Sequence, residues 1–311
     1  MGNRPRVTVL GSLNMDISVT VPRLPEPGAT VLGSSARFTP GGKGANQAVA
    51  AARLGADVRM AGCVGGDDFG RRLLAALRDE GVGDEGVRVT ADAPTGLAMI
   101  SVDHAGENII TVAPGANHEA GPAEVRAALT EPRNVLVVSA EIPVEVIVAA
   151  LARHHASILN LAPVPEPTAD AAAIVAGARP DWLVVNEIEA GAVLGRPVHG
   201  LAEAGEAAAA LLTTGARHAV VTAGAHGAAL AGPDGAGAIG AFRVDAVDTV
   251  GAGDTFVGAL AVALAAGVPA AEAVRAAAAA GATAATRPGA QAGMPRPADI
   301  AAATGLSWPA G

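Results

Sequence analysis

The sequence predicts an α/β fold, a doubly wound and mainly parallel sheet flanked by helices, with a small β-sheet lid. The first reason is that short apolar runs alternate with longer helical patterns between residues 57 and 222, as in chains that cover a parallel sheet on both faces. The second is that pairs of short β-like runs lie within about 12–40 and 95–113, outside this alternation. We therefore expect a single domain over 1–311, with the lid strands inserted in those two regions.

The first expected element is a buried strand at 6–10, which ends at Gly11 and leads into a loop that carries Asn14 and Asp16. The lid runs are separated by prolines and glycines, which is typical of exposed strands, and we place them at 17–21, 30–32, 96–102 and 108–112. Further strands are expected at 58–62, 135–139, 157–160, 182–185, 219–222, 228–230 and 242–244. Helices are expected at 48–54, 69–80, 143–154, 170–176, 187–194, 201–214, 254–266, 270–286 and 298–303.

The composition indicates an acidic protein with a closely packed core. Half of the residues are hydrophobic, mostly alanine, and the net charge is −9 with a sequence pI near 5.2. This charge would repel nucleic-acid phosphates, so we expect no nucleic-acid partner. Cys63 is the only cysteine, which excludes an intrachain disulfide. The longest uncharged run, 255–271, is too short for a membrane span, so we expect a cytoplasmic protein with no membrane partner.

Residues 248–260, Asp-Thr-Val-Gly-Ala-Gly-Asp-Thr-Phe-Val-Gly-Ala-Leu, carry the strongest sign of chemistry. Gly251 and Gly253 leave the backbone bare where an apolar helix begins, so successive N–H groups can bind an anion. Asp254 follows, and a carboxylate beside a phosphate can accept a proton from an attacking hydroxyl. The pattern therefore favours phosphoryl transfer. The alternative is that Asp254 only caps its helix.

A second glycine-rich stretch, Gly-Gly-Lys-Gly-Ala-Asn-Gln, lies at 41–47. A P-loop would need glycine at 37 and Ser or Thr at 44, whereas the chain has Arg37 and Gly44. Polar Lys43, Asn46 and Gln47 near a glycine turn suit a neutral polyol better. Lys43 is also the only lysine among 21 basic residues, so an ammonium group is either required there or has survived a compositional bias by chance.

Polar residues follow several expected strands at their carboxyl ends, which is where ligands gather in a parallel sheet. The set comprises Asn14, Asp16, Glu141, Asn186, Glu189, Thr222 and Gly224. They are more numerous than helix capping requires, although capping remains the alternative.

Residues 41–48 and 248–256 together resemble the two signatures of the ribokinase-like (PfkB) carbohydrate kinases, and the likeness extends to shorter motifs at 11–16, 106–108, 115–117, 186–189 and 286–291. The resemblance implies an enzyme that transfers the γ-phosphate of ATP to the 5-hydroxyl of D-ribose, giving D-ribose 5-phosphate and ADP. Deoxyribose, fructose or a nucleoside are alternative acceptors, and a catalytically silent sugar or nucleotide sensor is an alternative of another class. A dinucleotide oxidoreductase is disfavoured, because the first strand lacks a following Gly-x-Gly-x-x-Gly turn.

The resemblance also implies a role for each matched residue. The catalytic base would be Asp254, with Lys43 stabilising charge and an anion hole formed by Gly251, Ala252 and Gly253. The sugar would be bound by Asn14, Asp16, Gly42, Lys43, Asn46, Glu141 and Asp254. The nucleotide would contact Asn186, Glu189, Thr222, Gly224, Gly227 and Gly253, and Glu189 would hold Mg²⁺ through water.

An activating monovalent cation, K⁺, would bind beside the anion hole at Asp248, Val250, Ala284, Arg287 and Gly289. The chain departs from the family pattern at two positions. Gly293 stands where a serine hydroxyl commonly faces the cation, and Ala278 stands where a polar side chain often lies near the adenine. The first departure bears on the strength of K⁺ activation, and the second on base selectivity. Pairing of two lids is expected to give a homodimer.

Overall fold

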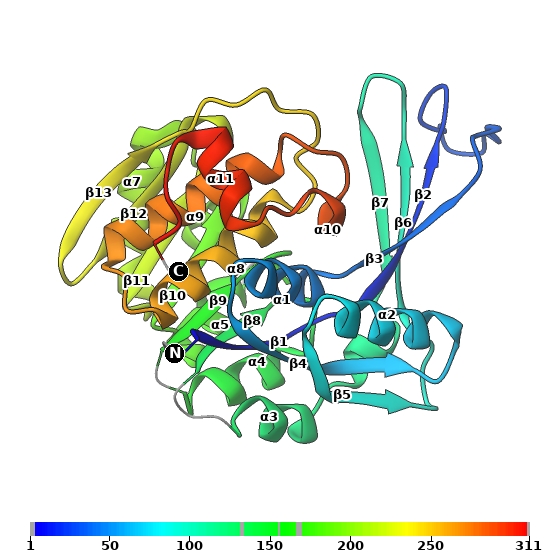
Figure 1. Ribbon diagram of the computed structural model, residues 1–311, viewed down its shortest axis with the longest axis horizontal. Coiled ribbons are helices and arrows are strands. Elements are labelled where there is room, and N and C mark those ends of the chain that lie inside the picture. Colours follow the sequence, from blue (N-terminus) through cyan, green and yellow to red (C-terminus); the bar gives the residue numbers. More distant parts are fainter. Residues whose placement is uncertain (1–3, 131–133, 155, 166–169, 310–311) are drawn as a thin grey trace.

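The computed structural model describes residues 4–130, 134–154, 156–165 and 170–309 (Figure 1). Within these ranges the strands form a nine-stranded sheet of order β13-β12-β11-β10-β9-β8-β1-β4-β5 and a four-stranded sheet of order β3-β2-β6-β7. The predicted α/β architecture with a second small sheet is therefore confirmed.

The large sheet consists of β1 Arg6–Leu10, β4 Asp57–Gly65, β5 Gly83–Thr90, β8 Val135–Ser139, β9 Ser157–Asn160, β10 Trp182–Asn186, β11 His218–Thr222, β12 Gly227–Gly232 and β13 Gly235–Gly240. Neighbouring strands from β5 to β11 pair in parallel, whereas β12 and β13 pair antiparallel at one edge. All the parallel strands consequently end at the same side of the sheet, and side chains that follow them are brought together.

Helices cover both faces of this sheet. One face is packed by α1 Lys43–Arg53, α2 Asp68–Asp79, α8 Ala252–Ala265, α9 Ala270–Ala284 and α11 Pro297–Thr304. The other is packed by α3 Pro122–Ala128, α4 Val144–Leu151, α5 Ala171–Ala178, α6 Glu187–Leu194 and α7 Gly200–Leu211. Short helices are η1 Gly115–Glu119, η3 Leu212–Thr214, η4 Gly224–His226 and α10 Ala290–Gly293. Alternate residues of one strand serve the two cores, since Val137 faces the first and Val138 the second.

The small sheet consists of β2 Asn14–Thr20, β3 Arg37–Gly41, β6 Gly96–Val102 and β7 Asn108–Ala113. Figure 1 shows these strands standing away from the main body, beside α1 and α2. Because β2 follows β1 directly and β3 leads directly into α1, the sheet is fixed at its base to the carboxyl end of the parallel strands.

Some expectations for the small sheet were wrong. Asn14 and Asp16 do not lie in a loop but on β2, where Asn14 pairs with Gly41 and Asp16 with Thr39. Residues 30–32 form no strand, and the partner of β2 is β3 instead. The sequence pattern concealed β3 because it contains a proline, which an edge strand tolerates since one side needs no ladder hydrogen bonds.

Other differences arise where local propensity is weak. Residues 242–244 form no strand, and β12 pairs instead with the glycine- and alanine-rich β13. The edge strand β5 and the short helix α3 were not expected. Helix α1 begins at Lys43 rather than at residue 48, so the polar part of the glycine-rich motif lies on the helix itself.

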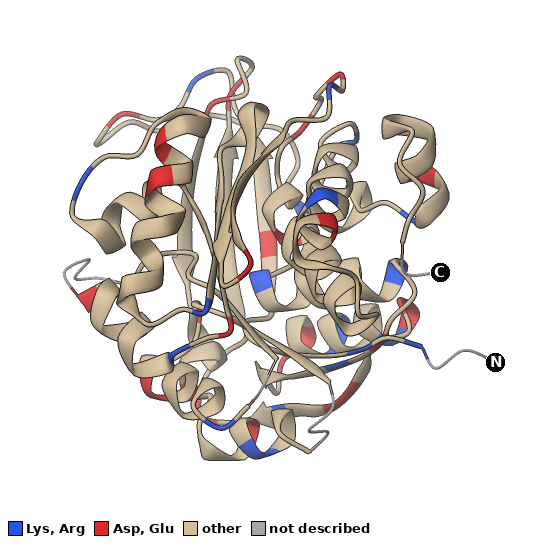
Figure 2. Cartoon of the chain, turned by 90° about the vertical axis from the view of Figure 1, so that its left-hand side faces the viewer, with Lys and Arg blue, Asp and Glu red and all other residues tan. Residues whose placement is uncertain are grey.

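Charged residues are interspersed over the protein, with acidic and basic positions neighbouring each other on many elements (Figure 2). Among the described residues, no helix combines the length and the hydropathy that crossing a membrane demands.

Candidate active site

Helix α8 begins at a glycine whose conformation few other residues could adopt. Gly251 is the N-cap with φ 77°, and a Cβ there would lie 2.9 Å from the Cα of Ala290. The first intrahelical hydrogen bond is donated by Thr255 N–H to the Gly251 carbonyl at 2.8 Å. The N–H groups of the first turn therefore have no carbonyl within the helix to bind. The N–H of Ala252 donates instead to the Thr249 carbonyl at 3.2 Å, which leaves those of Gly253 and Asp254 available to an anion.

Asp254 is the third residue of this helix, and its carboxylate does not cap it. One oxygen accepts a hydrogen bond from Asn46 Nδ2 at 2.9 Å, and the other accepts one from Gln47 Nε2 at 3.1 Å. Both donors come from α1, so the carboxylate connects α8 to α1 and does not cap α8. The side chain is buried, with 9% of the residue exposed. The alternative that Asp254 serves as an ordinary N-cap is therefore excluded.

Burial raises the pKa of Asp254, and the Glu141 carboxylate acts in the same direction. The Lys43 ammonium and the hydrogen bonds from Asn46 and Gln47 oppose this rise, because they stabilise the ionised form. The net effect is a pKa above the ordinary aspartate value. A carboxyl group with a raised pKa is a better proton acceptor than a fully solvated one.

Glycines allow α1 and α8 to bring these groups together. Gly42 caps α1 with φ 88°, and a Cβ there would lie 2.6 Å from the backbone nitrogen of Asn14. Where α8 crosses α1, a Cβ on Gly258 would lie 2.7 Å from the Gln47 carbonyl oxygen. The close approach of α8 to α1 therefore depends on the absence of a side chain at Gly258, and the approach of α1 to the start of β2 depends on its absence at Gly42.

Two further residues extend the hydrogen bonds of Asp254 to the sheet. Gln47 Nε2 also donates to Asn160 Oδ1 at 2.9 Å, and Asn160 Nδ2 donates to the Val184 carbonyl at 3.1 Å. The sequence indicates Gln47 as a polyol residue beside Asn46, whereas here it donates to Asp254 and Asn160. Asn160 was not among the predicted site residues, although it could have been found as the last residue of a parallel strand.

A second group of polar residues surrounds the base of the small sheet. Glu141 accepts hydrogen bonds from Ser12 Oγ and, at 3.2 Å, from Lys43 N–H. Asn14 is buried, and its Oδ1 accepts a hydrogen bond from Asn117 Nδ2 at 2.7 Å. Ser12 and Asn117 were not singled out as site residues, although each lies in a short motif noted in the sequence.

The charges of this group affect one another. Burial raises the pKa of Asp16 to about 7, and the nearby carboxylates of Glu141 and Asp254 add to the rise. Burial lowers the pKa of the Lys43 ammonium, but Asp254, Glu141 and Glu189 outweigh it, so the net pKa is raised. Lys43 therefore stays protonated among several acids, as a charge-stabilising role requires.

A cavity of about 220 Å³ opens at the start of α8. Predicted residues in its lining are Lys43, Asn186, Glu189, Thr222, Gly251, Gly253 and Asp254. Gly224 and Gly227 lie outside this lining, in the turn after β11, where Ala223 N–H donates to the Gly227 carbonyl at 2.8 Å. Asn186 and Glu189 cap α6 reciprocally, through Glu189 N–H to Asn186 Oδ1 at 2.9 Å and Asn186 N–H to Glu189 Oε2 at 2.8 Å.

Burial raises the pKa of Glu189, and Asp254 adds to the rise, whereas Lys43 and the Asn186 N–H oppose it. No group of three His, Cys, Asp or Glu side chains suited to holding a metal occurs among the residues that the structure describes.

The residues predicted for a monovalent cation converge next to α8. Asp248 accepts hydrogen bonds from Val250 N–H at 3.0 Å and from Gly289 N–H at 2.8 Å, which joins the segment before α8 to the segment before α10. A Cβ on Gly293 would lie 3.1 Å from the Arg287 carbonyl oxygen and 3.2 Å from that of Ala284. Ala278 lies on α9 and packs against the core.

Comparison with known proteins agrees with this geometry. The model of the pfkB family carbohydrate kinases matches residues 4–297. A ribokinase of Schizosaccharomyces pombe is 37% identical over 93% of this chain and 94% of its own length, and one of Bacillus subtilis is 38% identical over 93% and 96%. Arabidopsis thaliana ribokinase, solved with ribose and ATP, superposes with TM-score 0.83 at 29% identity over 98% of this chain and all of its own.

Escherichia coli phosphofructokinase-2, solved in complex with potassium, superposes with TM-score 0.78 at 25% identity over 96% of this chain and 98% of its own. The fold and the glycine-flanked acid at a helix start define a class of phosphotransferases. The chain belongs to the pfkB family of carbohydrate kinases.

The raised pKa of Asp16 predicts a pH-dependent cost in stability. With a folded pKa of about 7 against an ordinary 3.8, the folded protein binds the proton more tightly, so this group lowers stability as the pH rises from about 4 to about 7. Asp16→Asn should therefore stabilise the protein at pH 8 by about 1–2 kcal/mol, after a discount for partial exposure. Urea denaturation at pH 8 and pH 5 measures the gain, which should shrink at pH 5.

Asp234→Asn, in an exposed turn, is the matched control and should change stability little at either pH. A gain for Asp16→Asn that is equal at both pH values, or no gain at pH 8, would contradict the electrostatic explanation.

Proposed function

We propose that the chain is an ATP-dependent kinase that transfers the γ-phosphate of ATP to the 5-hydroxyl of D-ribose, giving D-ribose 5-phosphate and ADP. The observation that carries the proposal is the position of Asp254. Its buried carboxylate lies in the first turn of α8, where free N–H groups favour an anion, and within electrostatic reach of Asp16 and Glu141 at the base of the small sheet. The name and the bound ribose of the solved relative support ribose as the acceptor.

In the proposed arrangement the sugar binds between the small sheet and α1. Its hydroxyl groups are held by Asn14, Asp16, Gly42, Lys43, Asn46 and Glu141. A carboxylate has two oxygens and can accept hydrogen bonds from two neighbouring hydroxyl groups, which suits Asp16 to a vicinal diol. Gly42 supplies backbone that a side chain would block.

The proposed reaction needs one proton acceptor and one site for negative charge. Asp254 takes the proton of the 5-hydroxyl group as the oxygen of that hydroxyl forms a bond to the γ-phosphorus. The bond from this phosphorus to the β,γ-bridging oxygen breaks, and its electron pair stays on ADP. The N–H groups around Gly251, Ala252 and Gly253 and the Lys43 ammonium stabilise the charge on the transferred group.

The nucleotide is proposed to lie over the cavity at the start of α8. It would contact Asn186, Glu189, Thr222, Gly224, Gly227 and Gly253. The cap of α6 uses Glu189 Oε2, so Oε1 can meet water bound to Mg²⁺, an ion that keeps several waters when bound to proteins. When bound, Mg²⁺ offsets the repulsion between the triphosphate and the surrounding acids.

Support for a K⁺ site comes from the carbonyl groups around Gly293. The carbonyl oxygens of Arg287 and Ala284 both lie close to the position that a Cβ on Gly293 would take. Asp248 fixes the two segments in which Val250 and Gly289 would act as ligands. Backbone oxygens of this kind suit an alkali cation. Because Gly293 has no hydroxyl group, we expect K⁺ to activate the enzyme only a few-fold.

The four-stranded sheet is proposed to act as a lid on a single domain covering 1–311. A lid closed over the sugar would exclude water, which competes as phosphoryl acceptor. Its exposed apolar side chains, Phe38, Met99, Ile109, Ile110 and Val112, are proposed to pair with those of a second lid in a homodimer.

A panel of acceptors tests the substrate directly. ADP release with Mg-ATP measures turnover, and we expect kcat/KM to be higher for D-ribose than for deoxyribose, fructose and adenosine. Turnover of ribose should rise a few-fold when KCl replaces choline chloride. It should vanish when EDTA removes the divalent metal. A clear preference for another acceptor would refute the assignment to ribose. Ribose binding by calorimetry with no turnover of any acceptor would instead indicate a silent sensor.

Asp254→Asn removes the proposed base while keeping the shape of the side chain. We expect kcat with saturating ribose and Mg-ATP to fall on the order of 10²-fold or more, because general-base assistance is lost. Asp79→Asn, on the exposed side of α2, is the matched control and should leave kcat unchanged. Wild-type turnover in Asp254→Asn would rule out this residue as the base.

The proposed dimer can be tested on the apolar side chains of the lid. Light scattering should give twice the chain mass of 30.2 kDa for the parent. Ile110→Asp should give a monomer, because burying an unpaired carboxylate costs several kcal/mol, whereas Arg126→Asp on the distant α3 should remain dimeric. A monomeric parent, or a dimer that survives Ile110→Asp, would contradict pairing through the lids.

A further inference from the structure

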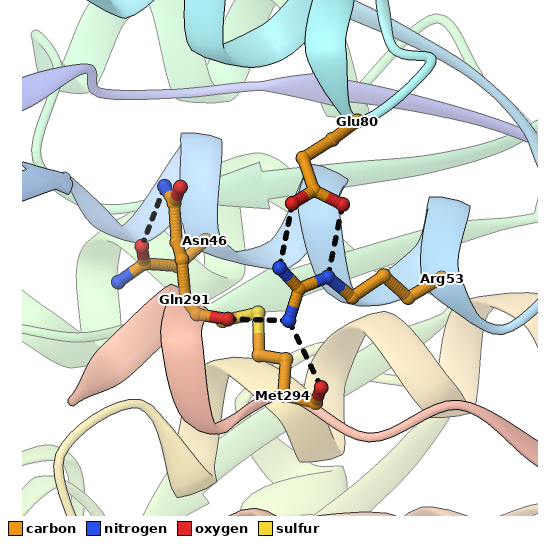
Figure 3. A network of polar contacts seen from close by, with 5 residues as sticks. All are labelled: Asn46, Arg53, Glu80, Gln291 and Met294. Carbon is orange, nitrogen blue, oxygen red and sulfur yellow. Dashed lines mark hydrogen bonds and ion pairs between the residues drawn. The ribbon is translucent and has the colours of Figure 1, made fainter. Parts of the chain in front are cut away.

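The amide of Asn46 bridges the base and the C-terminal region. Its Nδ2 donates to Asp254 Oδ2 at 2.9 Å. Its Oδ1 accepts a hydrogen bond from Gln291 Nε2 at 3.1 Å, as Figure 3 shows. A primary amide presents a donor on one side and an acceptor on the other. Rotation of the amide by half a turn would point an oxygen at the carboxylate. The carboxylate of Asp254 only accepts, so it requires the donor side of Asn46, and the Gln291 donor stabilises this orientation by satisfying the acceptor side.

Gln291 is itself held by a charged group at the other end of α1. Arg53 forms a two-point ion pair with Glu80, through Nε at 2.9 Å and Nη2 at 2.6 Å. Its Nη1 donates to the carbonyls of Gln291 at 2.6 Å and of Met294 at 3.0 Å, as Figure 3 shows. The side chains of Arg53 and Glu80 are only 16% and 23% exposed, so the ion pair is shielded from solvent.

Helix α1 therefore carries both ends of one connected network. Asn46 lies near its first turn and contacts the base, and Arg53 lies in its last turn and fixes the backbone of α10. The ion pair of Arg53 with Glu80, called the clamp below, thereby holds Gln291, on α10, in contact with Asn46. No contact between Gln291 and the carboxylate of Asp254 is required for the effect.

We propose that Gln291, clamped by Arg53 and Glu80, is a positioning residue that orients Asn46 so that Asp254 keeps its second amide donor during the reaction. The inference rests on the proposed function of Asp254 as the base. It assigns a catalytic purpose to a residue outside the cavity, on a helix that adjoins the proposed cation site.

The test replaces the donor by an acceptor of the same shape. In Gln291→Glu, an ionised carboxylate attracts Asn46 Nδ2 and turns Oδ1 toward Asp254, which loses a donor and faces an oxygen. Loss of a hydrogen bond to the charged form raises the pKa of a carboxyl group, so more of the base is protonated at a given pH. We expect the acid limb of the kcat/KM profile to move up by roughly one pH unit, with about tenfold lower kcat/KM at pH values below that limb and recovery at pH 9.

Several controls separate orientation from other effects. Ala292→Glu adds the same charge at the exposed neighbouring position and should leave the acid limb in place. Gln291→Met removes the donor without adding charge and should give a smaller shift in the same direction. In an Asn46→Ala background, Gln291→Glu should change kcat/KM less than twofold, because the residue acts through Asn46.

Apart from the substituted positions, these variants keep every charged residue around Asp254 and around the Arg53–Glu80 clamp. Those facing Asp254 are Lys43, Glu141, Asp16 and Glu189, and those around the clamp are Arg53, Glu80 and Arg296.

Thermal unfolding of each variant checks folding, and if Gln291→Glu does not fold, Gln291→Met carries the test. An acid limb and kcat equal to the parent in the folded Gln291 variants would overturn the inference, as would an undiminished effect of Gln291→Glu without Asn46. Absence of turnover in the parent would instead refute the proposed function, so the two failures are distinguishable.

Discussion

The structure depends on one buried carboxylate held between two helices. Asp254 lies in the first turn of α8 and accepts hydrogen bonds from Asn46 and Gln47 of α1. A buried carboxylate is costly unless it is hydrogen-bonded, and these amide donors offset that cost without neutralising the group. The group thus remains able to take a proton while being kept in one position.

The need to hold this buried carboxylate between α1 and α8 explains several features of the surrounding structure. The two helices must approach closely, which explains the glycine at 258. The amide donors must be oriented, which explains the connections to Asn160 and Gln291. The N-terminus of α8 has to stay open to an anion, so its cap is Gly251 and not a side chain that would bind the N–H groups. The position of the proposed base and the packing of α1 against α8 therefore depend on the same residues.

The sequence was sufficient for the fold and for most of the residues around Asp254, because glycine patterns and apolar periodicity are local signals. It was insufficient where tertiary contacts override local preference. Helix α1 continues through Lys43 and Asn46 despite a glycine-rich start, since Gly44 packs against Gly11. The partners Asn160 and Gln291 are polar residues of ordinary appearance, and their importance arises only from side-chain pairings across more than 100 positions. The pairing of Gln47 with Asp254 likewise could not be read from the motif that contains Gln47.

The proposed mechanism requires Asp254 to lie at the acceptor oxygen of the sugar. A crystal structure with D-ribose and a non-hydrolysable ATP analogue would show this position. We expect the ribose 5-oxygen within hydrogen-bonding distance of an Asp254 carboxylate oxygen and in line with the γ-phosphorus. A ribose bound with its 5-hydroxyl directed away from Asp254, or a γ-phosphate distant from the first turn of α8, would contradict it.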